Sequence, residues 1–221
     1  MSGERQGQGS AGPQFQMRQC SGERCRFRFP APAGTTEGHV CPRCQSPTAF
    51  VTAPFSGRPP ETASPAGPHV EALLDNIRSI FNVGAMFRTA DGAGIRRLHL
   101  AGITATPDHP KVAKTALGAE RAVAWSEHPN GLDAATALRE RGYRLWALES
   151  TARSTNLFDT RPAAEGAPIL LIAGNELAGV DPQILALCQR TVHLPMEGVK
   201  GSLNVAIAFG VAAYYLRYSD R

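Results

Sequence analysis

From residue 69 onward, short runs of β-branched and aliphatic residues alternate with longer segments of helical periodicity, and this alternation restricts the fold more than any other feature of the sequence. The predicted strands cover residues 70–74, 98–101, 122–125, 143–148, 169–172 and 192–194. The predicted helices cover residues 84–93, 110–117, 132–141 and 182–188, and a last helix closes the chain. Alternating β and α units indicate an α/β fold with a mostly parallel sheet and helices on both faces. Sheets of this kind carry their sites in loops beyond the carboxyl ends of the strands.

A proline-rich segment, "VTAPFSGRPPETASPAGP" (residues 51–68), separates this region from the first quarter of the chain and is typical of a linker. Residues 1–18 are rich in Gly, Gln and Ser, and we expect a disordered tail there. The sequence thus predicts a tail, a small module over residues 19–50, a linker, and one full-sized domain over residues 69–221.

The small module contains four of the five cysteines, arranged as two close pairs fifteen residues apart: Cys20 with Cys25, and Cys41 with Cys44. Two such pairs are typical of a zinc ribbon, in which each pair turns tightly to place two thiolates on one Zn²⁺ ion. Disulfides fit less well with an odd cysteine total and no recognisable secretory signal. A redox CxxC explains only half of the cluster, and His39 is an alternative to one thiolate.

The formal charge of +4 is concentrated in residues 1–60, which contain seven arginines and three glutamates. The remaining residues carry sixteen basic and sixteen acidic side chains. A basic surface of this kind favours contact with nucleic acid, although a solvated tail has the same composition. Phe27 and Phe29 lie among these arginines. They are suited to stacking on unpaired bases or to forming the small core of the ribbon.

No apolar run has the roughly eighteen uninterrupted residues of a membrane span, because Ser202, Asn204 and Tyr214 interrupt the longest candidate. The expected location is the cytoplasm. The sequence contains no Walker phosphate loop, no GxGxxG signature and no persuasive Ser/His/Asp or Cys/His constellation. "DGAG" at residues 91–94 ends a predicted helix and is better explained as a C-cap.

Three polar segments each follow a predicted strand: "LDNIRSIFNVGAMFRTADGAGI" (74–95), "IAGNELAGVDP" (172–182) and "LPMEGVKGSLNVAIA" (194–208). Taken singly, each has an ordinary explanation, such as an arginine on the wet face of an amphipathic helix or a glycine turn before an Asp-capped helix. Their common position at strand ends predicts that they belong to one site.

In this order and at these separations, N-V-G-A-M-F-R-T-A-D, G-N-E-L-A-G-V and L-P-M-E-G-V-K-G-S-L-N-V-A-I-A resemble the three motifs of the SpoU (TrmH-like) RNA ribose methyltransferases of the SPOUT superfamily. The likeness extends over residues 69–221. It implies a deep trefoil knot in the C-terminal part, a binding site for S-adenosylmethionine, a homodimer, and transfer of a methyl group to a ribose 2′-hydroxyl in tRNA or rRNA.

The resemblance also assigns residues to the site. The reaction centre is expected to contain five polar side chains, Asn82, Arg88, Glu176, Ser202 and Asn204. The cofactor is expected to contact Gly174, Asn175, Glu176, Leu194, Met196, Gly198, Ser202 and Leu203, and Gly198 and Gly201 are expected to allow a tight loop path. We expect Arg88 to bind an RNA phosphate and stabilise a developing alkoxide, since a guanidinium is always protonated and therefore a poor base.

Two other functions stay open at this point. One is a non-catalytic RNA- or ribosome-binding protein that retains the fold, and the other is a DNA-binding zinc-ribbon regulator, which leaves the three polar segments unexplained.

Overall fold

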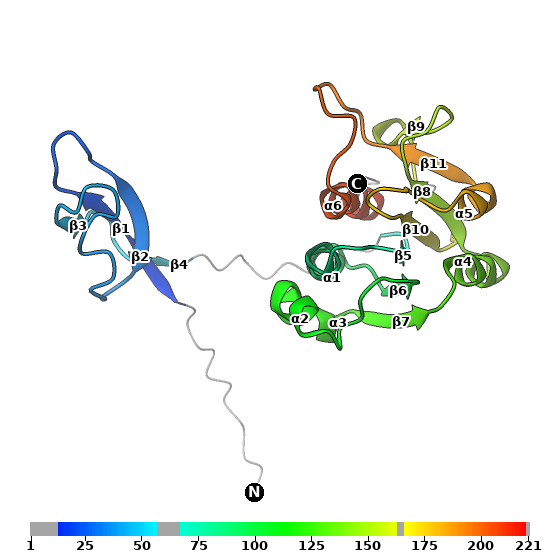
Figure 1. Ribbon diagram of the computed structural model, residues 1–221, viewed down its shortest axis with the longest axis horizontal. Helices are drawn as coiled ribbons and strands as arrows, with labels where there is room; N and C mark the ends of the chain where they lie inside the picture. Colours follow the sequence, from blue (N-terminus) through cyan, green and yellow to red (C-terminus); the bar gives the residue numbers. More distant parts are fainter. Residues whose placement is uncertain (1–12, 57–66, 163–165, 220–221) are drawn as a thin grey trace, which may run out of the picture. The chain divides into compact units, whose positions relative to one another are not determined.

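The computed structural model describes residues 13–56, 67–162 and 166–219 (Figure 1). The chain divides into two compact units, Met1–Ala63 and Ser64–Arg221, which are described separately below. Residues 1–12 of the expected tail and residues 57–66 of the expected linker lie outside the described residues.

The N-terminal unit is an antiparallel sheet in which a central strand pairs with all the others. Its strands are β1 (Gln14–Cys20), β2 (Arg28–Pro32), β3 (Thr48–Phe50) and β4 (Phe55–Ser56), in the order β2-β1-β3 with β4 also pairing with β1. The predicted tail and linker are therefore too long. Residues 14–18 belong to β1, and residues 55–56 extend the sheet because pairing with β1 satisfies their backbone groups.

The second unit is built on a seven-stranded parallel sheet in the order β7-β6-β5-β10-β8-β11-β9. The strands are β5 (Val70–Asp75), β6 (Arg97–Ala101), β7 (Ala124–His128), β8 (Arg144–Leu148), β9 (Thr155–Asn156), β10 (Ile169–Ala173) and β11 (Arg190–His193). Strand β10 is central and every residue in it is buried, which explains its continuous apolar sequence "ILLIA".

Helices cover both faces of this sheet, as predicted (Figure 1). They are α1 (Ile80–Ala93), α2 (Pro110–Ala116), α3 (Ala119–Ala122), α4 (Gly131–Glu140), α5 (Pro182–Leu187) and α6 (Val205–Tyr218), with a 3-10 turn at Leu157–Asp159. Phe87 of α1 and Phe209 of α6 belong to the larger core on one face, and Leu138 of α4 and Ile184 of α5 belong to the second core on the other.

Capping residues set the ends of the helices, including one helix start that differs from the prediction. Helix α1 begins four residues earlier than predicted, because the Ser79 side chain accepts from the backbone N–H of Asn82 and caps it. Asn82 therefore lies in the first helical turn and not in the preceding loop. The predicted caps at Gly94, which has φ 72°, and at Asp181, whose carboxylate accepts from the N–H of Gln183, are confirmed.

Strand β9, helix α3 and the 3-10 turn are short and were not predicted. The trefoil knot stays a prediction. Within residues 13–56, 67–162 and 166–219, no helix combines the length and the apolar character needed to cross a membrane.

Candidate active site

A cavity of about 380 Å³ lies at the carboxyl ends of strands β8, β10 and β11 and at the start of helix α6. This is the edge at which a parallel sheet of this type binds ligands. The structure brings to it most of the predicted cofactor residues from the second and third motifs. Its wall is formed by Leu148, Glu149, Ser150, Gly174, Asn175, Glu176, Leu177, Gly179, His193, Leu194, Met196, Gly201, Ser202, Leu203, Asn204, Val205 and Ala208.

The loop after β10 folds back on itself. Asn175 and Gly179 form a β-bridge with hydrogen bonds of 3.0 and 2.9 Å, and a Cβ atom at Gly174 would lie 2.4 Å from the backbone of Gly179. The Asn175 side chain accepts from the N–H groups of residues 177 and 178 and donates to the carbonyl of Asn76 at 2.7 Å. Gly174 is thus required by close packing, and Asn175 holds two loops together that are about a hundred residues apart in sequence.

Glu149 was missed by the sequence analysis, although it directly follows a predicted strand. Its carboxylate accepts from the N–H of Val180 at 2.9 Å and from the N–H of Ser150 at 3.1 Å. Glu149 therefore joins the loop after β8 to the end of the loop after β10 and places a carboxylate in the cavity wall. His193 is a second missed residue of the wall, and its Nδ1 lies 2.9 Å from the hydroxyl of Ser154.

Glu176 sits at the start of helix α1, although 97 residues separate it from Ser79. One carboxylate oxygen accepts from the N–H of Arg78 at 2.8 Å, and the other accepts from the N–H of Ser79 at 3.0 Å and from the side-chain amide of Asn82 at 2.9 Å. Burial alone would raise the pKa of Glu176, but these hydrogen bonds outweigh it and hold the pKa below its ordinary value. The carboxylate is therefore ionised at neutral pH, at the helix end that favours negative charge.

The same network continues to the third motif. The side-chain amide of Asn204 donates to Asn82 Oδ1 at 3.1 Å, and Asn204 Oδ1 accepts from the N–H of Ala206 at 2.9 Å, which caps helix α6. Glu176, Asn82 and Asn204 thus form one chain of hydrogen bonds that joins the loop after β10 to the first turn of α1 and to the N-cap of α6. Each asparagine side chain is held in one orientation by the partners on both of its ends.

Gly198 and Gly201, the two glycines that were predicted to allow a tight loop path, differ from expectation. An added Cβ atom at Gly198 or Gly201 would meet no heavy atom within 4 Å, and neither residue has a positive φ angle. The tight path that was predicted to require glycine at these positions is therefore not observed. Gly201 lines the cavity and Gly198 does not.

The structure does not bring Arg88 to the cavity of its own chain. Its side chain is exposed on helix α1, and within the described parts of the chain it forms no hydrogen bond or salt bridge. The guanidinium is therefore available to a partner outside this unit.

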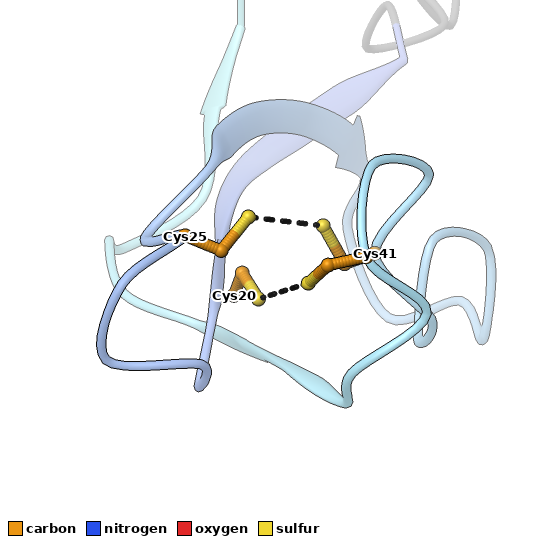
Figure 2. A group of neighbouring side chains, drawn as sticks. Cys20, Cys25 and Cys41 are labelled. Atoms are coloured by element: carbon orange, nitrogen blue, oxygen red, sulfur yellow. Dashed lines mark hydrogen bonds between the residues drawn. The ribbon is translucent and has the colours of Figure 1, made fainter.

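The cysteine cluster of the N-terminal unit is the candidate metal centre. The four sulfur atoms of Cys20, Cys25, Cys41 and Cys44 all lie within 4.8 Å of one another. Figure 2 shows the side chains of Cys20, Cys25 and Cys41 in this cluster. The Sγ atoms of Cys20 and Cys44 are 3.4 Å apart, and those of Cys25 and Cys41 are 3.9 Å apart. Zn–S bonds of about 2.3 Å in a tetrahedron require sulfur atoms roughly 3.8 Å apart, so the set fits Zn²⁺.

The chemistry of the sulfur atoms also suits a metal. All five cysteines of the chain are free thiols. Hydrogen bonds from the side chain and backbone of Ser46 lower the pKa of Cys44 to about 6. The pKa of Cys20 is raised to about 12, because the hydrogen bond from the N–H of Gly22, which lowers it, is outweighed by burial and the neighbouring thiols. A thiolate is the form that binds zinc. His39, the alternative ligand, is not part of the cluster, and its Nδ1 lies 2.8 Å from the carbonyl of Thr36.

The fold and the cavity define an α/β protein with a ligand site at the carboxyl edge of a parallel sheet. A profile of the SpoU rRNA Methylase family matches residues 69–214, and the chain belongs to this family.

Relatives named as RNA methyltransferases are also similar to this chain. The tRNA (guanosine(18)-2′-O)-methyltransferase of Thermus thermophilus is 31% identical over 147 residues, which cover 66% of this chain and 73% of that protein. The 23S rRNA (guanosine(2553)-2′-O)-methyltransferase RlmP of Bacillus subtilis is 32% identical over 149 residues, which cover 66% of this chain and 56% of that protein.

Solved structures agree with this assignment. The AdoMet-bound rRNA methyltransferase from Sinorhizobium meliloti superposes with a TM-score of 0.64 at 27% identity, over 71% of this chain and 59% of that one. The SpoU methyltransferase AviRb from Streptomyces viridochromogenes, in complex with AdoMet, superposes with a TM-score of 0.58 at 29% identity, over 68% of this chain and 60% of that one. The chain thus spans less than two thirds of these solved structures.

Proposed function

We propose that the protein is an S-adenosylmethionine-dependent RNA methyltransferase that transfers a methyl group to a ribose 2′-hydroxyl of tRNA or rRNA. The observation that carries the proposal is the Glu176, Asn82 and Asn204 network beside the cavity, which joins all three family motifs. The named activities of the relatives and the AdoMet bound in the neighbouring structures support it.

The cavity suits the cofactor. Leu194, Met196 and Leu203 offer apolar contacts for an adenosine, and Gly174 contributes only backbone to the wall because its own loop fills the space where a side chain would lie. The Glu149 carboxylate in the wall is placed to accept hydrogen bonds from ribose hydroxyls. When bound, S-adenosylmethionine supplies an electrophilic methyl group on a sulfonium centre.

The residues of the chain then align the substrate. Asn82 and Asn204 hold fixed orientations through Glu176, and Ser202 lines the same part of the cavity, so together they offer polar partners to a ribose 2′-hydroxyl. Arg88 would form a bidentate contact with a phosphate of the RNA and stabilise the negative charge that develops on the 2′-oxygen. As the O–CH₃ bond forms, the S–CH₃ bond of the cofactor would break to leave S-adenosylhomocysteine, and the proton of the hydroxyl would pass to water.

A homodimer accounts for the position of Arg88. Helices α1 and α6 expose large apolar side chains: Phe81 is 63% exposed, Ile207 58% and Tyr214 48%. Ile207, Val211 and Tyr214 follow the spacing of one helix face. A second copy packed on this face would cover them and bring its own Arg88 to the interface. The arginine would then act beside the cavity of the other subunit.

The N-terminal unit supplies an RNA-binding surface, with Zn²⁺ on the four cysteines as its structural core. Arg24, Arg26 and Arg28 are exposed, and the ring of the exposed Phe27 lies 5.7 Å from that of the half-buried Phe29. Phe29 thus serves the core, and Phe27 is free to stack on a base. The cytoplasm, where tRNA and rRNA occur, is the expected place of action.

Calorimetry with S-adenosylmethionine, followed by transfer of a labelled methyl group to total RNA, tests the proposal. We expect binding of one cofactor per chain and label recovered as 2′-O-methylated nucleosides in either the tRNA or the rRNA fraction. Absence of cofactor binding would refute the proposal that the protein is a methyltransferase. Cofactor binding or RNA binding without any transfer would favour the alternative, a non-catalytic RNA- or ribosome-binding protein.

A further inference from the structure

Four polar side chains occupy the face of the sheet that packs against helix α4, at its β7 edge. Glu71 lies on the same face of β5 as the core residue Leu73, His99 of β6 pairs in register with Ser126 of β7, and His128 follows Ser126 by two residues on the same face. Glu71 is 8% exposed and His99 is 4% exposed. None of the four lines the cavity proposed for S-adenosylmethionine.

Three of these side chains place their polar atoms in a nearly equilateral triangle. His99 Nδ1 lies 3.2 Å from His128 Nε2, and the Ser126 hydroxyl lies 3.0 Å from the first of these atoms and 2.9 Å from the second. The other ring nitrogen of His99 lies 2.8 Å from Glu71 and donates to it, because a carboxylate only accepts. In this tautomer His99 Nδ1 carries no proton and turns its lone pair toward the triangle.

We propose that His99, His128 and Ser126 bind a divalent transition-metal ion of the zinc and copper class, at a second site independent of the cysteine cluster. At metal–nitrogen distances of about 2.0–2.1 Å, two nitrogens as far apart as these subtend roughly 100° at the metal, which is close to a tetrahedral angle. Imidazole is a preferred ligand of these ions. The carboxylate of Glu71 on the far nitrogen of His99 is the partner that orients a metal-binding imidazole.

A cavity next to the triangle leaves one coordination position open. It has a volume of about 300 Å³ and is bounded by His99 and His128 on the strands and by Asp133 of α4 and its C-cap residue Arg141, among others. The cavity provides a path for the ion and space for a water molecule or a small anion as the fourth ligand.

The position of the site indicates its role. Strand β7 is the edge of the seven-stranded sheet and pairs only with β6 among the described strands. An ion held by His99 on β6 and by Ser126 and His128 on β7 would cross-link the edge strand to the rest of the sheet. Because this ligand set exists only in the folded chain, the ion would stabilise the fold.

Zinc counting on the full chain tests the proposal. After dialysis against a small excess of Zn²⁺, we expect two zinc ions per wild-type chain and one in His128→Gln, with unchanged far-UV circular dichroism. Glu71→Gln should keep both ions but bind the second about 10–100-fold more weakly, because the orienting carboxylate is lost. His109→Asn is the matched control, since it removes an imidazole at the cap of α2 but keeps a capping side chain, and it should still bind two ions.

A melting-temperature series gives an independent readout. Zn²⁺ beyond the first equivalent should raise the Tm of the wild type and of His109→Asn, and should leave the Tm of His128→Gln unchanged. One zinc ion per wild-type chain that is retained in His128→Gln would overturn the proposal, because the triangle would then be a simple hydrogen-bonded cluster. Two zinc ions in both the wild type and His128→Gln would also overturn the proposal. So would an affinity for the second zinc ion that is the same in the wild type and in Glu71→Gln.

Discussion

Replacing Glu176 by glutamine tests whether the negative charge of this residue holds the active-site loops together. The substitution keeps the size of the side chain and one of its two oxygens. In the wild type, the N–H of Ser79 and the side-chain amide of Asn82 both donate to Oε1 of Glu176. The retained oxygen of the glutamine can still accept both bonds. The new NH₂ group, however, faces the N–H of Arg78, which is 2.8 Å from Oε2 in the wild type.

The expected decrease in stability follows from these three bonds. A hydrogen bond to a charged group contributes about 1.5–3 kcal/mol, and the Arg78 bond is removed altogether. The remaining two change from a charged to a neutral acceptor, which makes each roughly half as strong. Water compensates in part because Arg78 is exposed, so we expect the free energy of unfolding to fall by about 2 kcal/mol. For a unit of this size that corresponds to about 4–8 °C in Tm.

The assay is urea unfolding followed by tryptophan fluorescence from pH 7 to pH 3.5. Both tryptophans of the chain, Trp125 and Trp146, lie in the second unit, so the signal reports that unit alone. The pKa of Glu176 is lowered on folding, so its contribution to stability is complete above the unfolded pKa of about 4.3 and is lost as the pH falls through the folded value. The free energy of unfolding should therefore differ between wild type and Glu176→Gln by its largest amount at pH 7, and this difference should become smaller below about pH 4.

The matched control is Glu140→Gln, which removes the same charge from an exposed position at the end of helix α4. It should change the free energy of unfolding by less than about 0.5 kcal/mol. If the free energy of unfolding differs between wild type and Glu176→Gln by the same amount at pH 7 and pH 3.5, the reasoning is refuted. A neutral carboxyl group would then stabilise the loops as well as the carboxylate does.

Three further predictions concern the proposed function. Arg88→Lys should lower methyl transfer about 10²–10³-fold and leave the calorimetric affinity for S-adenosylmethionine unchanged; a large drop in cofactor affinity would place Arg88 in the cofactor site instead. Deleting residues 1–60 should weaken RNA binding and reduce the slope of log K against log salt by about 0.7–0.9 for each RNA phosphate that the unit neutralises, without changing cofactor affinity, and an unchanged RNA affinity would contradict the role given to the N-terminal unit. Ile207→Glu should shift the chain from dimer to monomer in sedimentation velocity, because it places a charge on the apolar face of α6, whereas a wild-type chain that is already monomeric would contradict the homodimer.

The sequence by itself determined the main elements of the fold and about half of the residues that line the cavity. Alternating β and α periodicity was sufficient to predict the parallel sheet covered on both faces, because burial on both faces imposes continuous apolar strands such as β10. The two cysteine pairs predicted one cluster, since each pair is close enough in sequence to turn onto a single ion. Capping residues such as Asp181 were predictable because a cap acts over two or three residues.

Only the tertiary structure decided which distant residues meet. The pairing of β5 with β10 brings Glu176 to the start of α1, and the pairing of β6 with β7 brings His99 to Ser126. Strand order is set by how whole faces pack and not by any local pattern. The sequence therefore predicted that the three polar segments share one site, but not which of their atoms are in contact. For the same reason, the exposed position of Arg88 outside the cavity of its own chain became visible only in three dimensions.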